Sequence, residues 1–77
     1  MERMTAEART KIQALYSYEW SMAEKAMEDL GDSFDWAELQ EYKARYQVHL
    51  EAARRIEDVL DALGYEFESR DGKMVIA

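Results

Sequence analysis

The sequence has no cysteine and no proline, and it holds three glycines and a single histidine. The lack of cysteine excludes disulfides, and with His49 as the only imidazole a structural zinc site lacks its usual ligands. Chains of this size bury little surface and often depend on such cross-links or on self-association. We therefore expect no metal and no cofactor, and a homodimer in place of a cross-link.

Long hydrophobic runs are missing too. No segment approaches the roughly 20 apolar residues that a membrane-spanning helix needs, and the N-terminal MERMTAEART has no apolar core for a signal peptide. Ten basic residues stand against seventeen acidic ones, for a net charge of −7. Nucleic acids and anionic membranes attract basic surfaces. We expect neither partner, and we expect a soluble protein of the cytoplasm.

Two long helices account for most of what is present. The glycines at 31, 64 and 72 divide the chain, and good helix formers fill the segments before the first two. We expect helices over residues 5–30 and 35–63, with Gly31 as the C-terminal cap of the first and Gly64 as the stop of the second. The short connection makes the two helices antiparallel neighbours.

The connection itself carries a helix start signal. Asp35 is the expected N-cap, and Glu38 three residues later completes a capping box. Phe34 and Leu39 flank the cap at the spacing of a hydrophobic staple, in which the first packs on the second.

Each expected helix carries an apolar stripe. That of the second helix alternates spacings of three and four, as in a coiled coil: Leu39, Tyr42, Tyr46, His49, Ala53, Ile56, Leu60 and Leu63. That of the first is broader: Met4, Ala8, Ile12, Leu15, Met22, Ala23, Ala26 and Leu30, edged by Tyr16, Trp20 and Met27. One partner helix does not cover so wide a stripe. The stripes thus favour a homodimer, as a four-helix arrangement.

The segment 65–76 changes to a period of two and predicts a β-hairpin that turns at Asp71-Gly72. A two-residue turn places Ile76 across from Phe67, and a three-residue turn with a bulge places Val75 there. A lone hairpin is marginal in water. We expect this one to dock at the open end of the helices.

The second helix offers a platform for the hairpin at its C-terminal end, where Val59 widens the apolar surface. The expected fold is a single domain of residues 1–77. Its class is α+β and mainly α: a long antiparallel helical hairpin followed by a β-hairpin, in the order α-α-β-β.

Glu19 lies within the apolar stripe of the first helix, where an unpaired carboxylate is costly. In an antiparallel pair that turns near residues 31–34, opposed positions sum to about 69, so Glu19 faces His49 or its neighbour. We expect Glu19 and His49 to form a buried polar pair. Such a layer fixes register in coiled coils. The alternatives are a pH-responsive switch and an acid/base pair.

Two further groups are candidates for an interface with another chain. Of the aromatic residues, Trp20 lies at the edge of the first stripe, and Tyr18 and Trp36 lie off the stripes. Aromatic side chains are typical interface anchors. Glu28, Asp29 and Asp32 gather where the two helices join. Acidic residues in a last turn oppose the helix dipole, so the helix itself does not explain them. They serve either simple solubility or docking onto a basic partner.

No glycine-rich phosphate loop, serine–histidine–aspartate set or HExxH helix occurs in the sequence, so we expect no enzyme. The expected function is a small acidic, non-catalytic module for protein–protein interaction or assembly, acting through its helical surface. The alternative is an acidic inhibitor or nucleic-acid mimic, of a phage or mobile-element type, that blocks a basic site on a target protein. In composition the chain is similar to many small bacterial and phage proteins.

Overall fold

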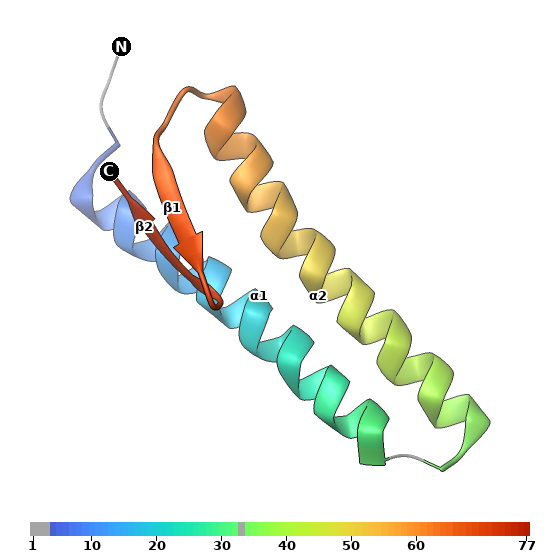
Figure 1. The fold of residues 1–77 in the computed structure, drawn as a ribbon. Helices are drawn as coiled ribbons and strands as arrows, with labels where there is room; N and C mark the ends of the chain where they lie inside the picture. Colours follow the sequence, from blue (N-terminus) through green and yellow to red (C-terminus); the bar gives the residue numbers. More distant parts are fainter. Residues whose placement is uncertain (1–3, 33) are drawn as a thin grey trace.

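The computed structural model describes residues 4–32 and 34–77. Helix α1 (Ala6–Asp32) and helix α2 (Trp36–Ala62) are followed by strands β1 (Phe67–Arg70) and β2 (Lys73–Ile76). The helices run antiparallel, and the strands form an antiparallel hairpin at the open end of the helical pair (Figure 1). The α+β, mainly-α class and the order α-α-β-β are confirmed.

The end of α1 differs from the expected one. The helix continues through Gly31 and ends at Asp32, so Gly31 is not a left-handed cap; the positive-φ glycines of the described chain are Gly64 and Gly72. Glycine permits the left-handed conformation but does not require it. Ser33, in the predicted connection, lies outside the described residues.

The start of α2 follows the sequence in one respect and departs from it in another. Asp35 is the N-cap, as predicted, and its Oδ1 accepts a hydrogen bond from the Ala37 backbone N–H at 2.8 Å. The predicted hydrophobic staple is wrong, because Phe34 is 100% exposed and does not pack on Leu39. No other described element covers this end of the molecule, so Phe34 would gain little by folding back on Leu39 alone.

Gly64 ends α2, as predicted. Its φ of 82° is left-handed. The Gly64 N–H donates to the Asp61 carbonyl and the Tyr65 N–H donates to the Leu60 carbonyl, which is the Schellman pattern of a helix C-terminus. The chain thus reverses sharply at Gly64 and sends the hairpin back along the helices.

The hairpin closes through a two-residue turn. Asp71 and Gly72 both have positive φ, 53° and 79°, as a type I′ turn requires, and Phe67 lies across from Ile76. Of the two turn types that the sequence allowed, the structure has the two-residue one.

The expected platform for the hairpin was right only in part. Leu60 at the end of α2 lies in one core with Met74 and Ile76 of β2. Strand β2 packs along α1, where the Ile76 N–H donates to Gln13 Oε1 at 2.9 Å, and Val59 at the end of α2 stays exposed. A Cβ added at Gly72 would lie 3.0 Å from Trp20 Cβ, so glycine also permits the close approach of the turn to α1.

The core lies where the three elements meet. Its buried residues are Tyr16 of α1, Ala53 and Leu60 of α2, and Met74 and Ile76 of β2. Tyr16, expected at the edge of the α1 stripe, is its buried centre, whereas Leu15, expected within the stripe, is 50% exposed. The reason is the hairpin, which covers the Tyr16 side of α1 and moves the core toward itself.

Candidate functional site

Glu19 and His49 meet near the middle of the helical pair. Glu19 Oε2 accepts a hydrogen bond from His49 Nδ1 at 2.6 Å, so the structure brings together the two residues that the register argument paired. Their side chains are 16% and 23% exposed respectively, so the pair is partly rather than fully buried. Because each polar group satisfies the other, the pair suits a register-fixing role.

One side of this pair opens on a small hollow of about 100 Å³. Lys25 and Asp29 of α1 and Tyr42 and Arg45 of α2 line it together with His49. Its two basic groups and one carboxylate give it a mixed charge. The Arg45 guanidinium is occupied on α2 itself, because it pairs with Glu41 and lies 5.7 Å from the centre of the Tyr42 ring.

A second polar contact joins three elements, and sequence reasoning missed it. Glu57 Oε1 on α2 accepts hydrogen bonds from the Tyr16 hydroxyl at 3.2 Å and from the Ser69 hydroxyl of β1 at 2.5 Å. Glu57 falls between the stripe positions of α2, and the tertiary arrangement alone brings Ser69 to it. The contact holds the hairpin over the helices and is structural in kind.

The face of the helices turned away from the hairpin carries an apolar groove. It is a hollow of about 230 Å³, whose exposed lining is apolar throughout, and we call it the interhelical groove. Ile12 and Leu15 of α1 and Arg55, Ile56, Val59 and Leu60 of α2 line it. Leu15 and Val59 are 50% and 56% exposed, and Leu63, one turn beyond Val59, is exposed as well. The groove has the character of a contact surface.

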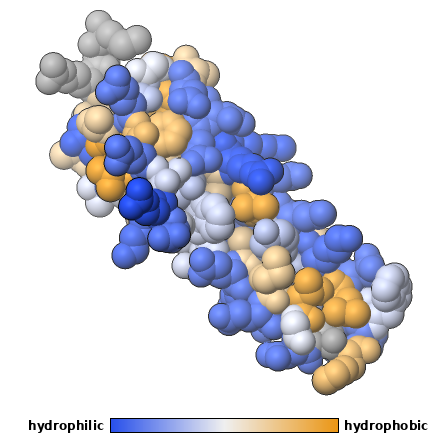
Figure 2. Space-filling model, in the orientation of Figure 1, coloured by the Kyte–Doolittle hydropathy of each residue, from blue (hydrophilic) through white to orange (hydrophobic). Residues whose placement is uncertain are grey.

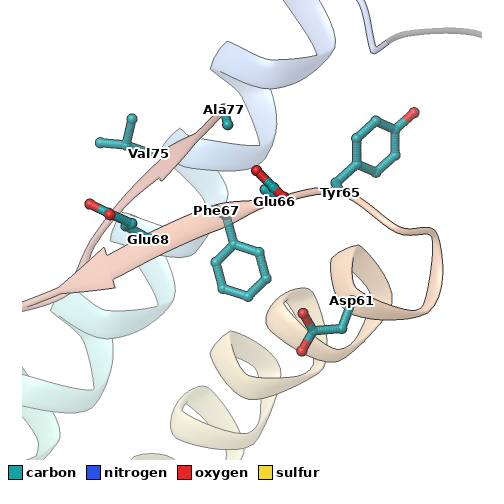
Figure 3. A pocket seen from close by; sticks show the side chains of 7 residues that line it. All are labelled: Asp61, Tyr65, Glu66, Phe67, Glu68, Val75 and Ala77. Carbon is teal, nitrogen blue, oxygen red and sulfur yellow. The ribbon is translucent and has the colours of Figure 1, made fainter.

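Another hollow, of about 520 Å³, lies between β1 and the end of α2 (Figure 3). Three carboxylates, those of Asp61, Glu66 and Glu68, line it together with Tyr65, Phe67, Val75 and Ala77. In Figure 3 the Phe67 ring points toward α2, while Val75 and Glu68 point away from it. The charges are of one sign, so this hollow disfavours an anionic ligand.

The aromatic interface candidates occupy different surroundings. Tyr18 is exposed, and Trp36 is 73% exposed at the start of α2, so both rings are accessible to another chain. Trp20 instead packs under the turn at Gly72, with its ring 6.4 Å from that of Tyr16. Trp20 therefore serves to seat the hairpin on α1.

The acidic candidates gather at the joined end of the helices. Glu28 and Asp32 are exposed and Asp29 is half-buried. Residues 28–41 hold six carboxylates and no lysine or arginine, a net charge of −6, which leaves −1 for the rest of the chain. We call this segment the acidic tip. Figure 2 shows hydrophobic residues gathered at the same end of the molecule, beyond the reach of the hairpin.

Within residues 4–32 and 34–77, no three histidine or acidic side chains are grouped so that they could hold a metal ion. Among the same residues, neither helix combines the length and the apolar character needed to cross a bilayer. The accessible features of the described chain include the interhelical groove, the acidic tip and the exposed aromatic rings.

Comparison with known proteins adds no assignment: no family model, no curated protein sequence and no solved structure matches this chain.

Proposed function

We propose that this protein is a small acidic, non-catalytic module for protein–protein interaction or assembly, and that it acts through its helical surface. The interhelical groove is the observation that carries the proposal. Leu15, Val59 and Leu63 expose aliphatic side chains on one face of two neighbouring helices. Exposed apolar patches often mark interaction sites in folded proteins, and these side chains border a groove with an apolar lining.

The overall dimensions support the same reading. The chain exposes 6055 Å², whereas a compact protein of its mass, 9.1 kDa, exposes about 4,900 Å². Its radius of gyration is 14.9 Å, against about 11 to 12 Å for a globular domain of this length. The excess surface follows from the 51 × 17 × 17 Å shape. Such a rod has surface to spare for a partner.

The polar groups support a non-catalytic role. Glu19 and His49 are hydrogen-bonded to each other, and Glu57 is bonded to Tyr16 and Ser69. These groups act in holding helices and strands together. An acid/base role for the Glu19–His49 pair would in addition need a substrate group within hydrogen-bond reach of one of its atoms.

A matched pair of substitutions tests the proposal. The tagged full chain captures its partners from source cells, including any untagged copy of itself, and each captured protein is then purified and rebound. We expect Val59→Glu to lose rebinding, because it places a charge in the groove, while Val75→Glu on the outer face of the hairpin retains it. Val59 and Val75 are 56% and 66% exposed, so both substitutions replace accessible valines. Equal binding by both would contradict a role for the groove.

The acidic tip favours a second candidate function, an inhibitor that occupies a basic site on a target protein. The tip combines a net charge of −6 with the exposed rings of Phe34 and Trp36. Such binding should weaken steeply with salt, as charge-driven association does. Reversal of Glu28, Asp29 and Asp32 to lysine should abolish it, while Val59→Glu leaves it intact. A rebound partner indifferent to salt and to charge reversal would remove this candidate.

A further inference from the structure

The interhelical groove and the hairpin lie on opposite faces of the helical pair. On α1, Gln13 bonds the hairpin and Leu15 lines the groove. Two residues of an α-helix turn through about 200°, so the two side chains point in nearly opposite directions. Across α2 the division is the same: Glu57 bonds Ser69 on the hairpin side, and Val59 lines the groove. A partner can therefore approach the groove without displacing the hairpin.

The groove has the size and the chemistry for an aliphatic side chain from outside. A cavity of about 150 Å³ holds a benzene molecule, and the groove measures about 230 Å³. Leu15 and Val59 project at its sides as half-exposed aliphatic residues. A second copy of the chain can place its own Leu15 and Val59 against this groove. Its identical groove can receive Leu15 and Val59 of the first copy. Two-fold symmetry requires this self-complementarity.

The exposed area matches what such a dimer needs. The chain exposes 6055 Å², which exceeds the value for a compact protein of its mass by about 1,200 Å². A stable interface buries about 800 Å² on each partner. One interface along the groove face thus removes most of the excess.

The charge distribution selects the orientation. The acidic tip carries −6 of the total charge of −7. A parallel dimer would place two tips side by side, where like charges repel. An antiparallel dimer centred on the groove places the tips at opposite ends, much farther apart than the Debye length of about 8–10 Å at physiological salt.

From these observations we infer that the interhelical groove is the contact face of an antiparallel homodimer, with the two hairpins outside and the two acidic tips at its far ends. This inference rests on the proposed function and specifies the partner, the face and the orientation. The dimer core is built from Leu15, Val59 and Leu63 of both copies.

The first experiment measures the mass of the purified full chain by sedimentation at micromolar concentration. We expect the wild type and Val75→Glu to sediment as dimers and Val59→Glu as a monomer, with unchanged far-UV circular dichroism in all three. A dimer that survives both Val59→Glu and Leu15→Glu would overturn the assignment of the face but leave an assembly role standing.

The second experiment measures orientation and uses the absence of native cysteine, so that a single introduced thiol carries the only spin label. Ala37 and Ile56 are 19 positions apart in α2, about 28 Å of helix. Labels at Ala37→Cys should therefore lie about 55 Å apart in the antiparallel dimer. In a parallel dimer they would lie within about 25 Å, because packed helices are about 8–10 Å apart.

Arg55→Cys is the companion label at the edge of the groove, and it should give a short distance because it lies near the symmetry axis. A short distance at Ala37 would overturn the orientation. A monomeric wild type would overturn the dimer altogether. A monomeric wild type would not by itself overturn the proposed function. That function fails only if Val59→Glu also leaves rebinding of captured partner proteins unchanged.

Discussion

The two halves of the helical rod are built differently. Near the open end, α1, α2 and the hairpin pack together, and the large buried side chains Tyr16, Leu60, Met74 and Ile76 lie there (Figure 1). Toward the acidic tip only two helices are present. The buried residues described in that half are Ala23 and Ala26.

The difference shows what the hairpin adds to the helical pair. Two helices in contact enclose little space, so only small side chains are fully buried along their seam, and larger ones remain partly open to solvent. A hairpin laid over the seam encloses a volume that can hold a tyrosine or a leucine. We therefore expect the open half to supply most of the folding free energy and the tip half to supply charge and accessible surface.

The largest expected effect comes from comparing two leucines of α2. Leu60→Ala removes a side chain that is 2% exposed in the half that carries the hairpin. It should lower the free energy of unfolding by about 2–5 kcal/mol. Leu39→Ala, at a half-buried position of the tip half, should lower the free energy of unfolding by less than about 1.5 kcal/mol. Urea unfolding at one fixed protein concentration measures both. Equal costs would break the comparison.

Two glycines give the next contrast. Gly72→Ala forces a left-handed φ of 79° on a residue with a Cβ and brings that atom to 3.0 Å from Trp20, so it should destabilise the fold by about 1–3 kcal/mol. Gly31→Ala lies in the helical end of α1 with no atom within 4 Å and should stabilise the chain by up to about 1 kcal/mol. Thermal unfolding separates the two. A stabilising Gly72→Ala would mean that the turn does not seat on Trp20.

The smallest effect belongs to the Glu19–His49 pair, which lies at the boundary of the two halves. Glu19→Leu alone leaves His49 without its acceptor and should cost about 1–2 kcal/mol. Adding His49→Leu should recover much of that loss, because both polar groups are then gone. A double-mutant cycle in urea measures the coupling. Additive effects would show that the 2.6 Å contact contributes no stability.

Local signals in the sequence were enough to predict the order of elements and most of their ends. Asp35 as N-cap and the stop of α2 at Gly64 are confirmed, because each depends on chemistry within a few residues. The heptad spacing of α2 and the antiparallel register also sufficed to pair Glu19 with His49, since a short connection leaves little freedom in how two helices align.

Predictions that needed a third element were less successful. The staple of Phe34 on Leu39 failed because the sequence does not reveal whether anything covers that end. The hairpin was placed on the end of α2 alone, because the apolar surface around Val59 looked sufficient from the stripe. Leu60 does meet the hairpin, but β2 also packs along α1, and Val59 stays exposed. Glu57 was missed because its partners Tyr16 and Ser69 are distant in sequence.

The sequence by itself determined two antiparallel helices, their register and a terminal hairpin, since caps, turns and hydrophobic periods act over short distances along the chain. Only the tertiary structure decided on which side of the helices the hairpin lies. That choice buried Tyr16 and exposed its neighbour Leu15. The physical reason is that both faces of the helical pair are apolar enough to be covered. The face that the hairpin leaves uncovered, with Leu15 and Val59, is the one proposed to meet a second copy.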